Sequence, residues 1–213
     1  MRRLFAIGVA AAAVVGVAVG VLLHSSFSAG RAQAQPLAVP KLQGQATWKA
    51  GRVAAPTFVL NDQRGQEISL RSYRGKTVVL LFMDSLCRNV CPVEGKEVAL
   101  AVKQLAPSAR PAILIVSVNM ADTRATIADA AAHWNLPKGY EWLRGTRAQL
   151  QRVWSAYHIA VMATKNGGVV HSDAFYVIDR NGDERAGFLS PFIPGLLTGD
   201  LRYLATRASP THT

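Results

Sequence analysis

Residues 77–92 read TVVLLFMDSLCRNVCP and hold the only two cysteines of the chain, Cys87 and Cys91. The first seven residues are apolar or β-branched without alternation, which is typical of a strand buried on both faces of a sheet. Pro92 suits the first turn of a helix, and residues 93–105 carry apolar side chains at helical spacing. The stretch therefore predicts a central strand that leads through a cysteine-bearing turn into a helix.

The sequence on either side alternates short strands with helices. After a hairpin over residues 58–70, we expect strands over 77–83, 112–118, 140–143, 174–179 and 184–188, and helices over 93–105, 123–134, 147–157 and 194–205. The Asn181-Gly182 pair suits the tight turn between the last two strands. This order predicts an α/β domain with a thioredoxin-like fold, in which helices flank a central mixed sheet.

The N-terminus carries an uncharged, apolar run from Leu4 to Leu23, directly after Arg2 and Arg3. Twenty helical residues span roughly 30 Å, the thickness of the hydrocarbon core of a bilayer. The run predicts a single transmembrane helix with the two arginines in the cytoplasm and the remaining chain on the extracytoplasmic, periplasmic side of the cell membrane. A cleaved signal peptide is the alternative, because residues 32–34 offer a small-x-small cleavage site, and it would leave a secreted or periplasmic protein. The absence of a nearby cysteine excludes a lipoprotein anchor.

These features divide the chain into four predicted parts. Residues 1–24 form the transmembrane anchor or signal peptide, and residues 25–51, rich in Ala, Gln, Gly and Pro, form a flexible tether. Residues 52–207 form the thioredoxin-like domain, and residues 208–213 form a C-terminal tail.

The formal net charge of +11 raises the question of nucleic acid binding. The basic residues are dispersed and mostly arginine, without a block of five or six like charges and without an RNA-binding aromatic motif. We therefore expect no nucleic acid partner and interpret the charge as a solvated surface that favours a membrane or an acidic docking partner.

The spacing of Cys87 and Cys91 indicates redox or metal chemistry. At positions i and i+4 of a helical turn their Cα atoms lie about 6 Å apart, which permits a reversible disulfide or a clamp of two thiolates. A structural disulfide is a poor alternative, because so short a loop constrains the unfolded chain little. The helix N-terminus and Arg88 should lower the thiolate pKa, whereas Asp84 should raise it.

His171 is the candidate third ligand. It lies in a glycine-containing loop just before the strand over 174–179, and in thioredoxin-like domains this loop faces the active-site helix. Two thiolates and an imidazole form a soft ligand set suited to Cu(I), or to Cu(II) with a further ligand.

Several motifs of the chain resemble the SCO/SenC family. They are Phe58-x-Leu60 with Asp62 and Gly65, Arg74-Gly75-Lys76-x-Val78-x-Leu80-x-Phe82, Cys87-x3-Cys91-Pro92, and Val170-His171-Ser172-x-Ala174-Phe175-Tyr176 with Ile178, Asp179 and Gly182. The family consists of copper-binding, thioredoxin-fold proteins that help to assemble the CuA centre of cytochrome c oxidase. The resemblance implies that Cys87, Cys91 and His171 bind copper, and that the oxidase subunit carrying CuA is the partner. The chain departs from the family pattern at Asp84, Arg88 and Asn89, and in a shortened stretch over 119–123.

Three functions remain open at this point. The first is a copper-binding assembly factor that delivers copper to the CuA site or reduces its cysteines, a metallochaperone more than an enzyme. The second is a general thiol–disulfide oxidoreductase of thioredoxin or TlpA type for exported thiol proteins, in which Cys87 attacks and Cys91 resolves. The third is a peroxidase of peroxiredoxin type, which leaves His171 unexplained.

Overall fold

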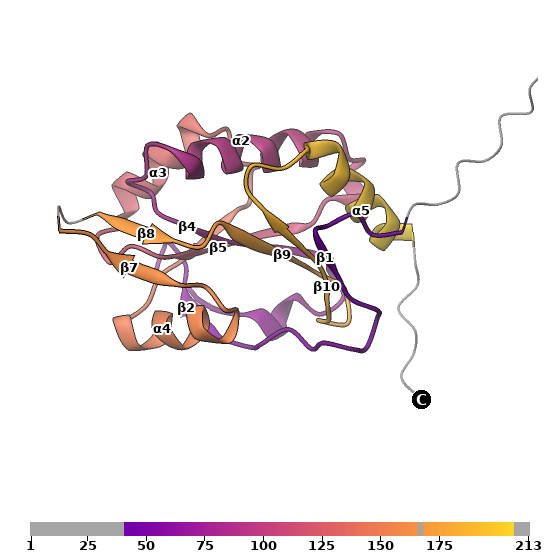
Figure 1. Cartoon of the computed structure of the whole chain (residues 1–213), viewed down its shortest axis with the longest axis horizontal. Helices are drawn as coiled ribbons and strands as arrows, with labels where there is room; N and C mark the ends of the chain where they lie inside the picture. Colours follow the sequence, from indigo (N-terminus) through magenta and orange to yellow (C-terminus); the bar gives the residue numbers. More distant parts are fainter. Residues whose placement is uncertain (1–40, 166–167, 207–213) are drawn as a thin grey trace, which may run out of the picture. The chain divides into compact units, whose positions relative to one another are not determined.

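The computed structural model describes residues 41–165 and 168–206, and these contain one six-stranded mixed sheet (Figure 1). The strand order is β1-β10-β9-β4-β5-β6, with β4 parallel to β5 and antiparallel to β9. The strands are β1 (Ala46–Thr47), β4 (Val78–Met83), β5 (Ala112–Ser117), β6 (Glu141–Leu143), β9 (Ala174–Ile178) and β10 (Glu184–Leu189). The predicted thioredoxin-like α/β architecture is confirmed.

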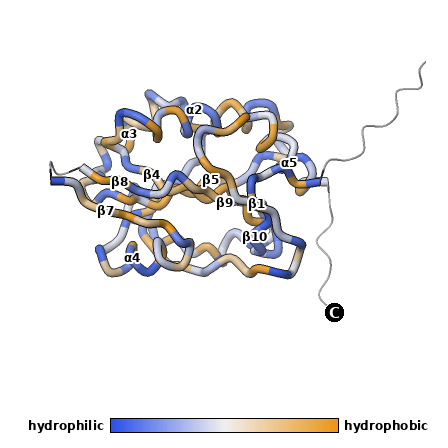
Figure 2. Tube along the Cα trace, viewed as in Figure 1, coloured by the Kyte–Doolittle hydropathy of each residue, from blue (hydrophilic) through white to orange (hydrophobic). Residues whose placement is uncertain are grey.

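Strand β4 lies at the centre of this sheet because its sequence is apolar on both faces. Every residue from Val78 to Met83 is buried. Val79, Leu81 and Met83 pack into one hydrophobic core, and the alternating residues of β4 pack into a second core on the other face. The Cα trace coloured by hydropathy shows apolar residues along the central strands (Figure 2).

Helices cover both faces of the sheet (Figure 1). On one side lie α2 (Val90–Lys103), α3 (Arg124–His133) and α5 (Pro194–Thr206), and on the other lie α4 (Arg147–Ala156) and the hairpin of β2 (Val59–Asn61) and β3 (Glu67–Ser69). Two short 3-10 helices, η1 (Leu70–Tyr73) and η2 (Pro107–Ala109), connect these elements. Helices α3 and α4 both begin with a capping box, at Thr123 and Thr146. Because α2 directly follows β4, its N-terminus lies at the end of the central strand.

Residues 41–51, which were predicted to be part of a flexible tether, pack on the domain. Strand β1 lies inside the range 25–51 and pairs with β10 at the edge of the sheet. Asp200 of α5 accepts hydrogen bonds from the amides of Gln43 (2.7 Å) and Gly44 (3.1 Å). The ring of Trp48 stacks on Tyr176 with centroids 6.3 Å apart. The tether prediction is therefore wrong for residues 41–51, because backbone pairing and one buried carboxylate hold a segment that lacks hydrophobic periodicity.

A second hairpin replaces the predicted loop around His171. Strands β7 (Val161–Ala163) and β8 (Val169–His171) pair in a two-stranded sheet of their own, with Val161 opposite His171. His171 thus ends a strand, and its position is fixed by the register of the hairpin.

The predicted transmembrane helix lies in residues 1–24, outside the described residues, as does the predicted tail over 208–213. Among the helices that the structure describes, none is both long and apolar enough to cross a membrane.

Candidate functional site

The turn between β4 and α2 is held by buried polar side chains. Asp84 Oδ1 accepts a hydrogen bond from the amide of Leu86 (2.8 Å) and another from Asn119 Nδ2 (3.1 Å). The amide of Cys87 donates to the carbonyl of Asp84 at 3.1 Å. These contacts fix the chain direction immediately before the first cysteine.

Asp122 supports the same turn from the loop after β5. Its Oδ1 accepts hydrogen bonds from the hydroxyl (2.6 Å) and the amide (3.0 Å) of Ser85, and its Oδ2 accepts one from Trp142 Nε1 (3.3 Å). Burial raises the pKa of Asp122, which these hydrogen bonds partly offset. Asp122 and Thr123 directly precede α3. The structure gives the cap to Thr123 and makes Asp122 a support of the cysteine-bearing turn.

Both cysteines are free thiols in this structure, and they lie in different environments. Cys87 is half-buried in the turn, whereas Cys91 lies in the first turn of α2 and is fully buried. The pKa of Cys87 is lowered to about 5, first by a hydrogen bond from the Cys91 thiol and then by backbone N–H groups of Asn89, Cys91 and Val90, against an opposing effect of burial. The Asn89 side chain does not cap α2, so the sulfur of Cys87 serves as the acceptor at this helix N-terminus.

Cys91 keeps its own proton when Cys87 has lost its proton to solvent. Its pKa is raised, first because its thiol donates to the Cys87 sulfur and then because of burial. The sequence prediction of a lowered pKa credited Arg88 and the helix N-terminus. In the structure the largest contribution comes from the second cysteine. The pair is therefore a thiolate at the rim and a thiol beneath it at neutral pH.

His171 approaches this pair from the hairpin. Its Nε2 lies 3.6 Å from Cys91 Sγ, and its side chain is only 6% exposed. Its Nδ1 lies 2.9 Å from the carbonyl oxygen of Ser172. Because a carbonyl can only accept, Nδ1 carries the proton of the neutral ring and the lone pair of Nε2 faces the sulfur. This tautomer is the one in which Nε2 can bind a metal ion.

The structure thus brings together the three residues that the sequence singled out. Cys87 and Cys91 share a proton, and Cys91 contacts His171, although β8 and α2 are far apart in the chain. Over residues 41–165 and 168–206, no group of three His, Cys, Asp or Glu side chains already has an arrangement that could hold a metal ion. Cys91 contacts both other donors, and its proton must leave before both sulfurs can bind a metal.

Glu94 is a buried group that the sequence analysis missed. It lies one helical turn after Cys91, is 1% exposed, and neither of its carboxyl oxygens has a hydrogen-bond partner in the structure. Burial raises its pKa well above the usual range, and the nearby acids Asp173, Glu97 and Cys87 raise it further. The helical spacing of Cys91, Glu94 and Val98 was a signal in the sequence, because it places a carboxyl on the core face of α2.

A family sequence model and several solved structures match this chain. The sequence model of a family described as SCO1/SenC matches residues 47–191. No curated protein matches the chain. The chain is similar to the crystal structure of a SCO1/SenC family lipoprotein from Bacillus anthracis, with a TM-score of 0.66 and 22% identity over 75% of this chain and 99% of that chain.

Two further solved structures share the fold. Bradyrhizobium japonicum ScoI with copper bound gives a TM-score of 0.59 and 23% identity over 71% of this chain and 99% of that chain. BsSco, described as a member of the Sco family of cytochrome c oxidase assembly proteins in which a disulfide switch was identified, gives 0.64 and 18% over 77% of this chain and 100% of that chain.

Proposed function

Because the chain belongs to the SCO1/SenC family, we propose that it binds copper through Cys87, Cys91 and His171 and acts in the assembly of cytochrome c oxidase. One observation carries the proposal: Nε2 of His171 lies 3.6 Å from Cys91 Sγ, next to the Cys87 thiolate. Thiolates and an imidazole suit Cu(I), and Cu(II) with a further ligand. Similar structures that contain copper, such as ScoI of Bradyrhizobium japonicum, support copper as the metal.

The protonation states assign a role to each ligand during copper loading. Cys87 is already a thiolate and half-exposed, so it meets the metal first. His171 offers an unprotonated Nε2 without a change of tautomer. Cys91 releases its proton as its sulfur becomes a ligand, so copper loading liberates about one proton per site near neutral pH. In this role copper is the cargo, and the oxidase subunit that carries CuA is the proposed recipient.

The same dithiol supports a second function, reduction of a disulfide in the recipient. The Cys87 thiolate attacks one sulfur of the partner disulfide, and the other partner sulfur leaves as a thiolate. Cys91 then loses its proton and attacks the mixed disulfide at Cys87. The products are a Cys87–Cys91 disulfide and a reduced partner that takes up two protons, so two electrons have passed to the partner. The half-exposed thiolate above a buried thiol favours this order of attack, and the disulfide switch described for BsSco concerns the same fold.

The N-terminal sequence is the basis for the proposed cellular location of the domain. We propose that residues 1–24 anchor the chain in the cell membrane and that the domain lies on the periplasmic side, because Arg2 and Arg3 precede the apolar run. Residues 52–207 then form the functional domain, preceded by the segment 41–51 that packs on it.

The test is a Cu(I) titration of the full-length, detergent-solubilised chain against a chromogenic chelator, in the reduced and the disulfide forms. We expect one copper per reduced chain and far weaker binding to the disulfide form, which offers no thiolates. His171→Ala should weaken copper binding at least about tenfold, as expected when one of few ligands is lost, and should leave disulfide formation intact. His133→Ala is the matched control, because His133 is an exposed helical histidine on α3.

One result would separate the alternatives. Equal copper affinity for the wild type and His171→Ala contradicts the copper site and favours the general thiol–disulfide oxidoreductase. Loss of copper binding in Cys87→Ser or Cys91→Ser alone does not decide between them, because both functions need the thiols.

A further inference from the structure

A groove of about 820 Å³ lies beside α2, on the helix that carries the dithiol. Its walls are formed by α2, by the residues that lead into β5, and by the segment that follows α3. The side chains that define it are Lys96, Leu100, Lys103, Arg110, Trp134 and Lys138.

Charge in this groove has one sign. Lys96, Lys103, Arg110 and Lys138 line it, and none of the described residues that line it is acidic. Within the described ranges none of these four cations forms an ion pair with a carboxylate. The groove therefore presents positive charge that the domain itself leaves uncompensated, which attracts a negatively charged ligand.

Apolar surface accompanies the charge along α2. Val93 and Leu100 are 44% and 53% exposed, although most apolar residues of the domain are buried. Val93, Lys96, Leu100 and Lys103 recur at intervals of three, four and three residues, so they form one stripe on the outer face of the helix. Leu86, the residue before the first cysteine, is also exposed, at 39%.

We propose that the groove and this stripe dock an acidic, amphipathic peptide segment of a protein partner. Carboxylates of the segment pair with the lysines and with Arg110, while its apolar side chains cover Leu100 and Val93. The partner's reacting thiols then reach Cys87, a step that rests on the proposed function, whereas the docking itself does not.

The dimensions suit a short extended segment. Along the axis of α2, Lys96 lies about 7.5 Å and Lys103 about 18 Å beyond Cys91, from the rise per helical residue. An extended peptide covers about 18 Å with five or six residues. A concave groove between two walls fits such a chain better than it fits the flat surface of an anionic bilayer, which is the other negatively charged candidate.

The probe is a fluorescein-labelled synthetic peptide of about eight residues, roughly 26 Å when extended, in which aspartates alternate with leucine and phenylalanine. Its binding to the full-length chain is measured by fluorescence anisotropy at low and at physiological salt. We expect saturable binding that Lys96→Glu/Lys103→Glu weakens at least about tenfold, because exposed ion pairs contribute up to about fivefold each and reversal adds repulsion. Cys87→Ser/Cys91→Ser should bind the peptide as the wild type does, which keeps this test independent of copper and of the dithiol.

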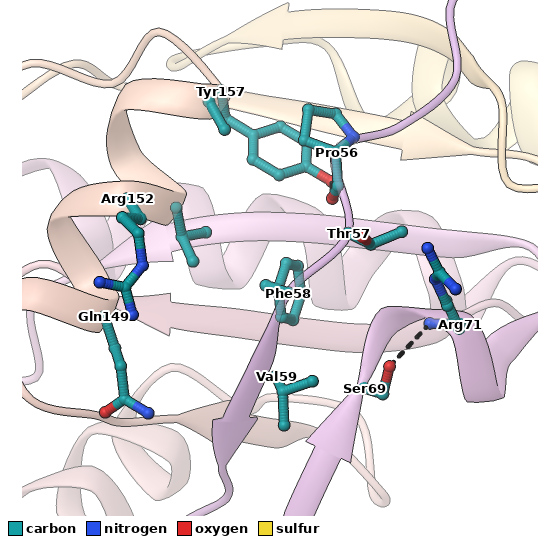
Figure 3. Close-up of a pocket in the computed structure, with 11 residues that line it drawn as sticks. Pro56, Thr57, Phe58, Val59, Ser69, Arg71, Gln149, Arg152 and Tyr157 are labelled. Atoms are coloured by element: carbon teal, nitrogen blue, oxygen red, sulfur yellow. Dashed lines mark hydrogen bonds between the residues drawn. The ribbon is translucent and has the colours of Figure 1, made fainter.

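A second basic cavity provides the matched control (Figure 3). It has a volume of about 580 Å³ on the face of α4 and β2, and Arg71 and Arg152 line it together with Phe58. Arg71→Glu/Arg152→Glu changes the net charge as much as the double lysine variant does, and it should alter peptide binding less than twofold.

Three results would overturn the proposal. In the first, both double variants lose binding equally, which indicates attraction by net charge alone. In the second, a peptide with serine in place of leucine and phenylalanine binds as tightly, which removes the role of the apolar stripe. In the third, the peptide does not bind and phosphatidylglycerol vesicles bind through Lys96 and Lys103, which makes the face a membrane contact.

Discussion

Replacing Glu94 with methionine should stabilise the domain. The wild-type carboxyl is 1% exposed, and neither oxygen has a hydrogen-bond partner among the described residues. Methionine is similar in length and in helix propensity and carries no group that needs such a partner. The substitution therefore removes a desolvation cost without opening a large cavity.

The magnitude follows from that cost. A buried polar group left without a partner costs about 1–3 kcal/mol. Glu94→Met should raise the free energy of unfolding by about that amount where the carboxyl is protonated in both states, which means below its ordinary pKa of 4.5. For a domain of this size each kcal/mol corresponds to about 2–4 °C in Tm.

The stability advantage of Glu94→Met over the wild type should increase with pH. Burial, followed by the nearby acids Asp173, Glu97 and Cys87, raises the folded-state pKa of Glu94. Above pH 4.5 the unfolded chain ionises this carboxyl while the folded chain keeps the proton, so the wild type loses stability as pH rises towards the folded-state pKa. Glu94→Met lacks this loss, and Glu94→Gln should lack it too while keeping most of the cost of burial.

Urea unfolding between pH 4 and pH 8, followed by circular dichroism, measures the difference. Glu97→Met is the control on the next turn of α2, because Glu97 Oε2 accepts a hydrogen bond from the Phe192 amide at 3.1 Å. That substitution should destabilise the domain by about 1.5–3 kcal/mol, the value of a hydrogen bond to a charged group. A Glu94→Met variant that is less stable than the wild type, or a difference independent of pH, would refute the reasoning.

Three further predictions follow from the site, the N-terminal segment and the anchor. The rate at which iodoacetamide alkylates Cys87 should have a pH midpoint near 5. Cys91→Ala should move this midpoint upwards, because the hydrogen bond that contributes most to stabilising the Cys87 thiolate is lost. A midpoint near 9 in the wild type contradicts this assignment. Asp200→Ala removes the acceptor for two backbone amides, at about 1.5–3 kcal/mol each, so hydrogen exchange of Gln43 should accelerate, and unchanged protection would show that β1 pairing alone holds the segment. Membrane fractionation should recover the chain with residues 1–24 attached, whereas a shortened chain in the soluble periplasmic pool means that the segment is a cleaved signal peptide.

The sequence predicted the fold well where local and long-range signals agreed. The uninterrupted apolar run of β4 identified the central strand, and helical spacing of apolar residues identified α2 after the cysteines. It failed for β1, whose two residues, Ala46 and Thr47, are exposed and gain their structure from pairing with β10. Strand pairing of this kind depends on a distant partner, so a local pattern does not reveal it.

The candidate site was also predicted only in part. Cys87 and Cys91 could be named from their type and spacing, and His171 from its place in the expected fold. In the structure Cys91 contacts both of the others. The hairpin that carries His171 was not predicted, because each of its strands has only three residues. Nor was Glu94 noticed, because the cost of a charged side chain depends on burial, and burial becomes apparent only when α2 packs on the sheet.

The hairpin of β7 and β8 separates the histidine ligand from the dithiol, which affects how the metal preference of the site can be altered. Cys91 lies in α2 and Cys87 in the turn before it, while the imidazole is carried by a small separate sheet with exposed residues such as Met162 (63%) and Val170 (53%). The third donor therefore lies on an element separate from the one that carries the dithiol, and one substitution in β8 exchanges it. A graft that places a thioether at position 171 would bias the scaffold towards softer ions, and a carboxylate there would bias it towards harder ones.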